Sequence, residues 1–114
     1  MPLQKLSFQI FAGQLNTTFQ VKLADGSTVP LQLVEAKRGA LRKTAGPKGT
    51  RYESFSLIFT GPLEQALDQR IHAFEHPRIG RFEIFIVPVV SRDTSLMHYE
   101  CIFNRPLVKS ARNV

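Results

Sequence analysis

Cysteine is nearly absent from this 114-residue chain, and tryptophan is missing altogether. The lone Cys101 excludes an internal disulfide, so nothing in the sequence calls for an oxidising compartment. Long hydrophobic runs are also lacking, because the longest, residues 84–90, contains Pro88 and is far too short to cross a bilayer as a helix. The first five residues do not resemble a signal peptide. These absences predict a cytoplasmic location, alone or within a larger particle, and no membrane partner.

The residues that are present suit one domain. Hydrophobic residues make up 43% of the chain, and nine of its aromatic residues are phenylalanine. Phenylalanine buries a large apolar ring without needing a polar partner, and a chain of this length buries roughly two-thirds of its unfolded surface. We therefore predict a single β domain over residues 1–107, followed by a frayed tail over residues 108–114.

The net charge of +6 originates in one segment. Residues 37–51 contain six basic residues and no acidic one, whereas the remaining basic residues balance the nine acidic ones. Several glycines and Pro47 predict a flexible loop here. Such a loop either keeps the protein soluble or contacts an anion, a nucleic acid or an acidic partner, and the single nearby aromatic residue, Tyr52, favours non-specific attraction over base stacking. The candidate contact residues are Lys37, Arg38, Arg42, Lys43, Lys48 and Arg51.

Alternating apolar and polar residues predict most of the strands. The pattern covers residues 17–23, 28–35, 53–60 and 70–75, and it returns at 99–103 before Arg105-Pro106 ends the final strand. Residues 81–90 are apolar on both faces, which predicts a strand that is central or covered by a second layer. Pro88 predicts a bulge or an unpaired position near its end.

Asp25-Gly26 predicts a hairpin turn between the first two of these strands. Because paired residues share a face, a loop of odd length is needed to bring the two apolar sets together. We predict a loop of three or five residues that places Leu23 opposite Val29, Val21 opposite Leu31 and Phe19 opposite Leu33.

Two further segments concern helices. Gly61-Pro62 ends a strand and predicts a short helix over residues 62–68, because proline suits the first turn of a helix. Residues 3–15 fit either a first strand or a short helix. The whole pattern predicts a mainly β, single-domain antiparallel barrel or sandwich of six or seven strands with one short helix.

Residues that could carry chemistry are few and poorly spaced. The plausible metal ligands, which lack the tight paired spacing of zinc motifs, are His72, Glu75, His76, His98 and Cys101. The simpler interpretation places His72 on a strand surface, His76 in the turn before Pro77, and Cys101 in the core with His98 on the opposite face.

Acidic residues stand mostly at polar strand positions, where exposure or pairing with Arg51, Arg81 or Arg105 is expected in place of catalysis. They are Glu53, Glu75, Glu83 and Glu100. The glycines form no phosphate-binding motif. The sequence therefore predicts no enzyme, no metal and no cofactor.

Three stretches in this order and spacing carry a resemblance to a known family. They are ESFSLIFTGP at 53–62, HPRIGRFEIFIVPV at 76–89 and YECIFNR at 99–105. With them the chain resembles a bacterial family of short, all-β domains of unknown function. The resemblance implies no catalytic residue and a loose association with genes for tail-collar-like proteins of phage or phage-derived particles. The basic segment 37–51 is longer and more charged than the usual loop of that family.

Three functional hypotheses follow. The leading one is a non-enzymatic interaction or assembly module, accessory to a phage-tail-like particle, with a protein partner or a second copy as its target. The alternative is a nucleic-acid-binding β-barrel that uses the basic segment 37–51. The last is a barrel that holds a small ligand between Phe55, Phe59, Phe82 and Phe85, although no substrate is identified.

Overall fold

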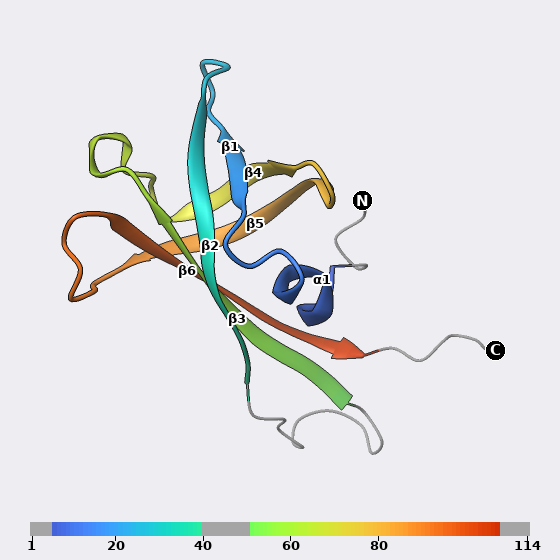
Figure 1. Cartoon of the computed structure of the whole chain (residues 1–114). Helices are drawn as coiled ribbons and strands as arrows, with labels where there is room; N and C mark the ends of the chain where they lie inside the picture. The colour runs from blue at the N-terminus through green and yellow to red at the C-terminus, as the bar shows by residue number, and fades with distance from the viewer. Residues whose placement is uncertain (1–5, 40–50, 108–114) are drawn as a thin grey trace.

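Six strands form a closed barrel in the order β1-β2-β3-β6-β5-β4, and every neighbouring pair is antiparallel (Figure 1). The computed structural model describes residues 6–39 and 51–107, and the side chains of residues 6–39 and 54–104. The prediction of a mainly β antiparallel fold is confirmed, with the barrel as the outcome in place of the sandwich. The elements are α1 (Phe8–Ala12), β1 (Thr18–Lys22), β2 (Thr28–Arg38), β3 (Arg51–Gly61), a 3-10 turn η2 (Leu63–Gln65), β4 (Arg70–His76), β5 (Gly80–Val89) and β6 (Met97–Leu107).

The β1–β2 hairpin has the predicted odd loop but a register shifted by two residues. Val21 lies opposite Val29 and Phe19 opposite Leu31. The loop is the shorter alternative, because the Leu23 N–H donates to the Ser27 carbonyl at 2.8 Å. Gly26, with φ of 91°, completes the turn in a conformation that glycine adopts without strain. The predicted pairs would have required a five-residue loop, so the face assignment was right and the pairing was wrong.

The undecided segment near the N-terminus is helix α1, which closes one end of the barrel (Figure 1). Ser7 caps it, since its hydroxyl accepts the N–H of Ile10 at 3.3 Å. β5 pairs with β4 over residues 80–86 and with β6 only over residues 87–89. β5 and β6 are therefore separated along residues 80–86 of β5. Phe11 of α1 fills the space between them.

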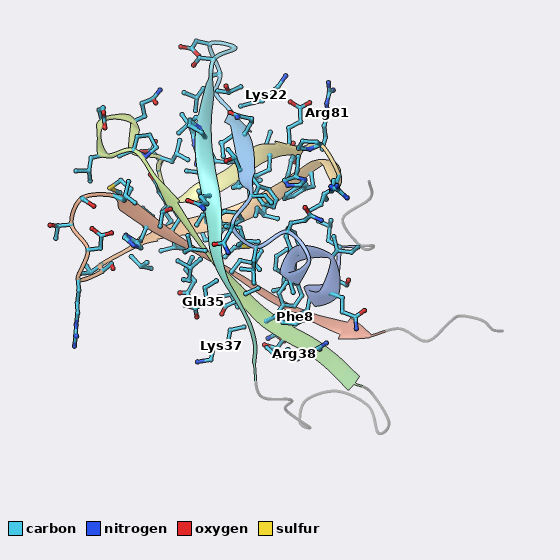
Figure 2. All side chains as sticks on the ribbon, in the orientation of Figure 1. Phe8, Lys22, Glu35, Lys37, Arg38 and Arg81 are labelled. Atoms are coloured by element: carbon cyan, nitrogen blue, oxygen red, sulfur yellow. The ribbon has the colours of Figure 1, made fainter. Side chains whose placement is uncertain are left out.

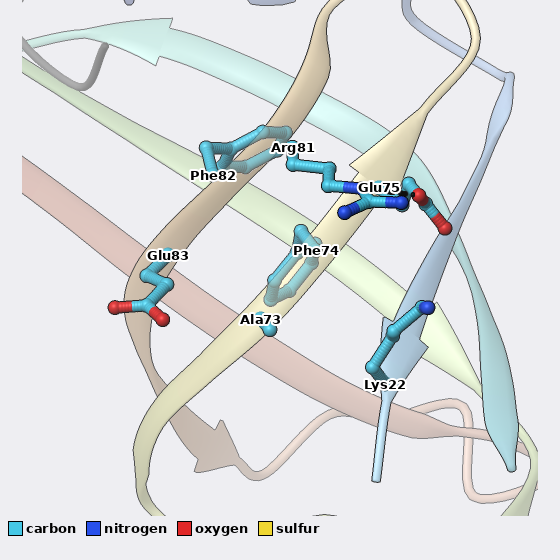
Figure 3. Close-up of a pocket in the computed structure, with 7 residues that line it drawn as sticks. All are labelled: Lys22, Ala73, Phe74, Glu75, Arg81, Phe82 and Glu83. Carbon is cyan, nitrogen blue, oxygen red and sulfur yellow. Dashed lines mark hydrogen bonds and ion pairs between the residues drawn. The ribbon is translucent and has the colours of Figure 1, made fainter. Parts of the chain in front are cut away.

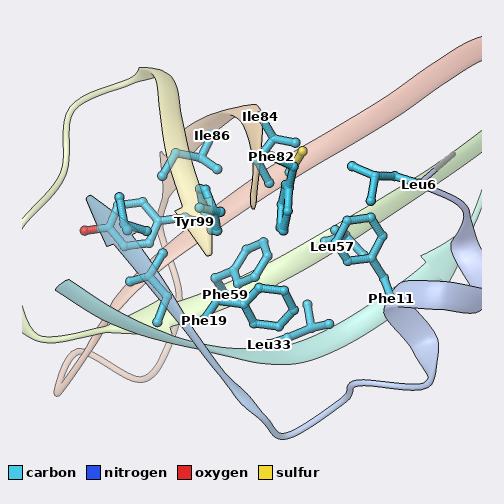
Figure 4. Close-up of a cluster of buried hydrophobic side chains, with 14 of the residues drawn as sticks. Leu6, Phe11, Phe19, Leu33, Leu57, Phe59, Phe82, Ile84, Ile86 and Tyr99 are labelled. Carbon is cyan, nitrogen blue, oxygen red and sulfur yellow. The ribbon is translucent and has the colours of Figure 1, made fainter. Parts of the chain in front are cut away.

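Phe11 and its neighbours make the core an aromatic cluster (Figure 4). The Phe11 ring centroid lies 5.7 Å from that of Phe82 and 5.6 Å from that of Phe103. Phe55 stacks on Phe103 at 4.5 Å. The ligand-barrel hypothesis is wrong at Phe85, which points outward, and the other three proposed lining rings are buried in this packed cluster.

The predicted helix at 62–68 is reduced to η2, which spans three residues. In a longer helix the N–H of Leu67 would bond within the helix. Here it donates instead to the hydroxyl of buried Tyr99 at 2.8 Å, and Ala66 is already extended. Tertiary contact therefore overrides the local helical pattern.

Several strands extend further than the sequence predicts. Lys37 and Arg38 belong to β2, and Arg51 begins β3. β6 continues through Arg105-Pro106 to Leu107, pairing throughout with β3. The flexible loop predicted for 37–51 is thus bounded by strand at both ends, while its residues 40–50 and the tail 108–114 lie outside the described residues. In the part of the chain that is described, no helix is long and apolar enough to span a membrane.

Candidate interaction surfaces

The predicted basic contact residues divide between two faces of β2. The register of β2 against β3 shifts between Leu33 and Glu35, which is the signature of a β-bulge. After the bulge Lys37 lies opposite Ser56 on the outer face, whereas Arg38 lies opposite buried Phe55 on the inner face. The sequence could not reveal this inversion.

Arg38 covers the helix that closes the barrel. Its guanidinium carbon lies 4.4 Å from the ring centroid of Phe8 in α1, in a cation–π contact. Figure 2 shows Lys37, Arg38 and Phe8 at one end of the molecule, and we call the exposed pair Lys37 and Arg38 the basic end. Arg51 begins β3, four residues before Phe55, which is the cross-strand partner of Arg38. The other three predicted contact residues lie outside the described residues: Arg42, Lys43 and Lys48.

His76 is a buried structural residue. Its Nδ1 accepts the N–H of Arg78 at 3.1 Å, so the proton is on Nε2, which donates to the hydroxyl of Thr17 at 2.9 Å. That hydroxyl in turn donates to the Gln14 carbonyl at 2.7 Å. Burial, with the nearby charge of Arg78, lowers the pKa of His76 below its usual value of 6.5. His76 therefore holds β4 to the segment before β1 as a neutral ring.

His72 is buried as well, so its predicted place on a strand surface is wrong. Its Nε2 donates to the Asp68 carbonyl at 2.8 Å. The strand alternation places His72 on the inner face opposite Ile84, a position that the short and mixed pattern of residues 70–75 did not identify.

Cys101 is buried on the inner face of β6, as predicted, with His98 at an outer-face position of the same strand. Burial, together with the neighbouring charge of Glu100, raises the pKa of the Cys101 thiol to about 12. A thiol in that state is not a nucleophile near neutral pH. Across residues 6–39 and 51–107, no three histidine, cysteine or acidic side chains gather in a way that could hold a metal ion.

Three of the candidate acidic residues lie on different strands in the described part of the chain. Glu75 accepts from Nε of Arg81 at 2.8 Å, which is one of the pairings predicted. Glu83 lies opposite Ala73, and Glu100 lies opposite Val87 on a different pair of strands. The side chain of Glu53 falls outside the described part.

Sequence reasoning missed an apolar surface on the outside of the barrel. The two-sided apolar pattern predicted a strand that is central or covered by a second layer; β5 does lie between β4 and β6, but Phe85 is 47% exposed. Ile71 of β4 lies directly opposite Phe85 and is 62% exposed, and Ile102 of β6 is 65% exposed. We call Ile71, Phe85 and Ile102 the apolar wall. In the sequence, the only indication of the apolar wall was the set of apolar residues on the second face of residues 81–90.

A hollow of about 380 Å³ lies beside the apolar wall, over β1, β4 and β5 (Figure 3). Its centre is Ala73, with Lys22 opposite on β1 and Glu83 opposite on β5. The Arg81–Glu75 ion pair borders it and separates it from a second depression of about 440 Å³. We call Lys22, Ala73, Glu75, Arg81 and Glu83 the charged hollow.

The fold and these surfaces define a small antiparallel β-barrel domain whose outer face carries neighbouring apolar and charged regions. Residues 6–103 match a domain of unknown function, DUF6916, and the chain belongs to this family. The resemblance to a family of unknown function is thereby confirmed at that level. No curated protein and no solved structure is significantly similar to the chain.

Proposed function

We propose that this chain is a non-enzymatic interaction module that binds a protein partner through the outer face of β4, β5 and β6. The observation that carries the proposal is the apolar wall, where Ile71, Phe85 and Ile102 project large apolar side chains away from the core. Exposed apolar residues gathered on one face are typical of protein interaction sites, whereas single scattered ones are not.

The strand register places Ile71 and Phe85 side by side, and it places Ile102 on the same outer face, two residues beyond the last β5–β6 pair. Ile71 and Phe85 form a direct cross-strand pair. Phe85 and Ile102 each stand two residues from the Val87–Glu100 pair, on the same side of it and on the outer face. Covering each of these side chains would contribute about 1–2 kcal/mol to binding, which suits a partner that docks flat against the barrel.

The setting we propose is assembly, accessory to a phage-tail-like particle. The resemblance of the three sequence stretches to a family associated with such particles motivates this choice. An assembly role requires a docking surface and no reacting groups, which agrees with a buried, unreactive Cys101 and a structural His76.

A second candidate is nucleic-acid binding at the basic end. Lys37 and Arg38 are both exposed there, and Arg51 begins the neighbouring strand at that end. Contacts of this kind with phosphates weaken steeply as salt rises. The test is binding to a mixed DNA and RNA sample at two salt concentrations with the chain and with Lys37→Ser/Arg38→Ser; affinity that is salt-independent or unchanged in the variant rejects this candidate.

The leading proposal is tested by affinity capture from host extract. We expect a stoichiometric partner with the wild-type chain and its loss with Ile102→Ser, which alters an exposed apolar residue without disturbing the core. Val34→Ser is the matched control, because Val34 is also exposed but lies on β2, outside the apolar wall. A partner other than a second copy of the chain that both variants retain, or no partner at all with the wild type, contradicts the proposal.

A further inference from the structure

The charged hollow has opposite charges on its two sides. Lys22, Ala73 and Glu83 form one row across β1, β4 and β5, so the cation and the anion flank a small central residue (Figure 3). Their backbones are about 10 Å apart, which is twice the spacing of neighbouring strands. Neither charged side chain has an ion-pair partner among the side chains that the structure describes.

From this arrangement we propose that the charged hollow binds a second copy of this chain, forming a symmetric dimer. The proposed two-fold axis lies between the two copies and is parallel to β4. In such a dimer each residue of β1 faces the β5 residue of the same row in the partner. Lys22 then meets the partner's Glu83, and Glu83 meets the partner's Lys22. The two unpaired charges of one chain are thus complementary to those of an identical chain.

The residues on the axis fit the same arrangement. Ala73 would face the partner's Ala73, and its small side chain does not hold the two barrels apart. Ile71, the next outer-face residue of β4, would meet the partner's Ile71 and bury its exposed side chain. Glu75 would also face its own copy, and its charge is offset by Arg81, 2.8 Å away within the same chain.

This inference rests on the proposed function, because it names the partner for one part of the interaction face. Ile102 of β6 lies outside the β1–β4–β5 contact. The two proposals can therefore fail separately: the variant that tests partner capture, Ile102→Ser, leaves the proposed dimer contact intact.

Charge reversal with rescue tests the proposal. The mass of the full chain is measured by light scattering or sedimentation from micromolar to millimolar concentration, for the wild type, Lys22→Glu, Glu83→Lys and the double variant. We expect a dimer for the wild type. Each single variant should raise the dissociation constant about tenfold or more, because each charge reversal turns two symmetric attractions into repulsions. The double variant should recover the wild-type dissociation constant.

Two exposed residues of β2 supply charge-matched controls. Lys37→Glu and Glu35→Lys change the net charge by the same amounts, far from the charged hollow, and should leave dimerisation unchanged (Figure 2). If Lys22 and Glu83 formed a pair within one chain, the charge reversals would alter the stability of the chain but not its measured mass. A wild-type chain that is monomeric at every concentration overturns the proposal, as does a dimer that the single variants do not weaken or the double variant does not restore. If a monomer still captures another protein that Ile102→Ser loses, the proposed function stands and the second copy is excluded.

Discussion

Removing the Phe11 ring should destabilise the barrel more than any change on its surface, because this ring fills the end where β5 and β6 separate. The side chain is fully buried and contacts four other rings, those of Phe19, Phe55, Phe82 and Phe103. Phe11→Ala removes both the transfer free energy of the ring and these contacts, and it leaves a cavity. We expect the free energy of unfolding to fall by about 3–5 kcal/mol.

Urea unfolding followed by circular dichroism measures this loss. With a denaturant slope of roughly 1–3 kcal/mol per molar for a small domain, the midpoint should fall by about 2 M. Gln9→Ala, in the same helix but exposed, should change stability by less than about 0.5 kcal/mol. Should Phe11→Ala not fold, Phe11→Leu keeps an apolar side chain and should lose roughly 1–2 kcal/mol. A loss from Phe11→Ala no larger than that of the Gln9 control would refute the view that α1 closes the barrel.

Three further predictions concern buried polar groups. Tyr99→Phe leaves the Leu67 N–H without its acceptor and should cost roughly 1–3 kcal/mol in thermal or urea unfolding, and an unchanged stability would argue against that bond. Because burial first, and Arg78 second, depress the pKa of His76 in the folded state, the unfolded state binds the proton more readily; stability present above pH 6.5 should decline as pH falls below it, and His76→Gln should flatten that decline. Cys101, whose pKa burial raises to about 12, should resist a thiol reagent at mildly alkaline pH in the native state and react fully in denaturant, so rapid native labelling would contradict its placement.

The strands were predictable because half-buried strands impose a period of two on the sequence. That pattern located five of the six strands to within a few residues, and it identified the core face of β1, β2, β3 and β6, while the apolar run at residues 81–90 located β5. It also placed Cys101 inside and His98 outside. Pairing was harder, because alternation fixes which face a residue occupies and leaves its exact partner open; the three-residue loop at Gly26 decided the register.

Features set by tertiary contacts were not predictable in this way. α1 is a five-residue helix with a single serine cap. It is stabilised by packing against aromatic rings of the strands, and these contacts cannot be read from the helix sequence itself. The same holds for η2, which stops because Leu67 bonds to Tyr99. The bulge in β2 turns Arg38 inward over Phe8, and no glycine or proline at the bulge could have predicted it.

The outer surfaces were misjudged for a related reason. The sequence of a strand does not tell whether its apolar residues are covered by a second layer of this chain or by another protein. The ligand-barrel hypothesis therefore placed Phe85 in the interior, whereas it is exposed. The charged hollow was invisible because Lys22, Ala73 and Glu83 come from three strands and meet only through the barrel closure. The six basic residues lie close together in the sequence, but two of them, Lys37 and Arg38, lie on opposite faces of β2.

The most direct test of the central claim, that the outer face of β4, β5 and β6 is a binding surface, is site-specific photo-crosslinking in host cells. A photoreactive phenylalanine analogue at position 85 should give one discrete adduct, and its mass distinguishes a second copy from another protein. The same probe at the exposed position 32 on β2 should give none. No adduct from position 85, or the same adducts from both positions, would contradict the account.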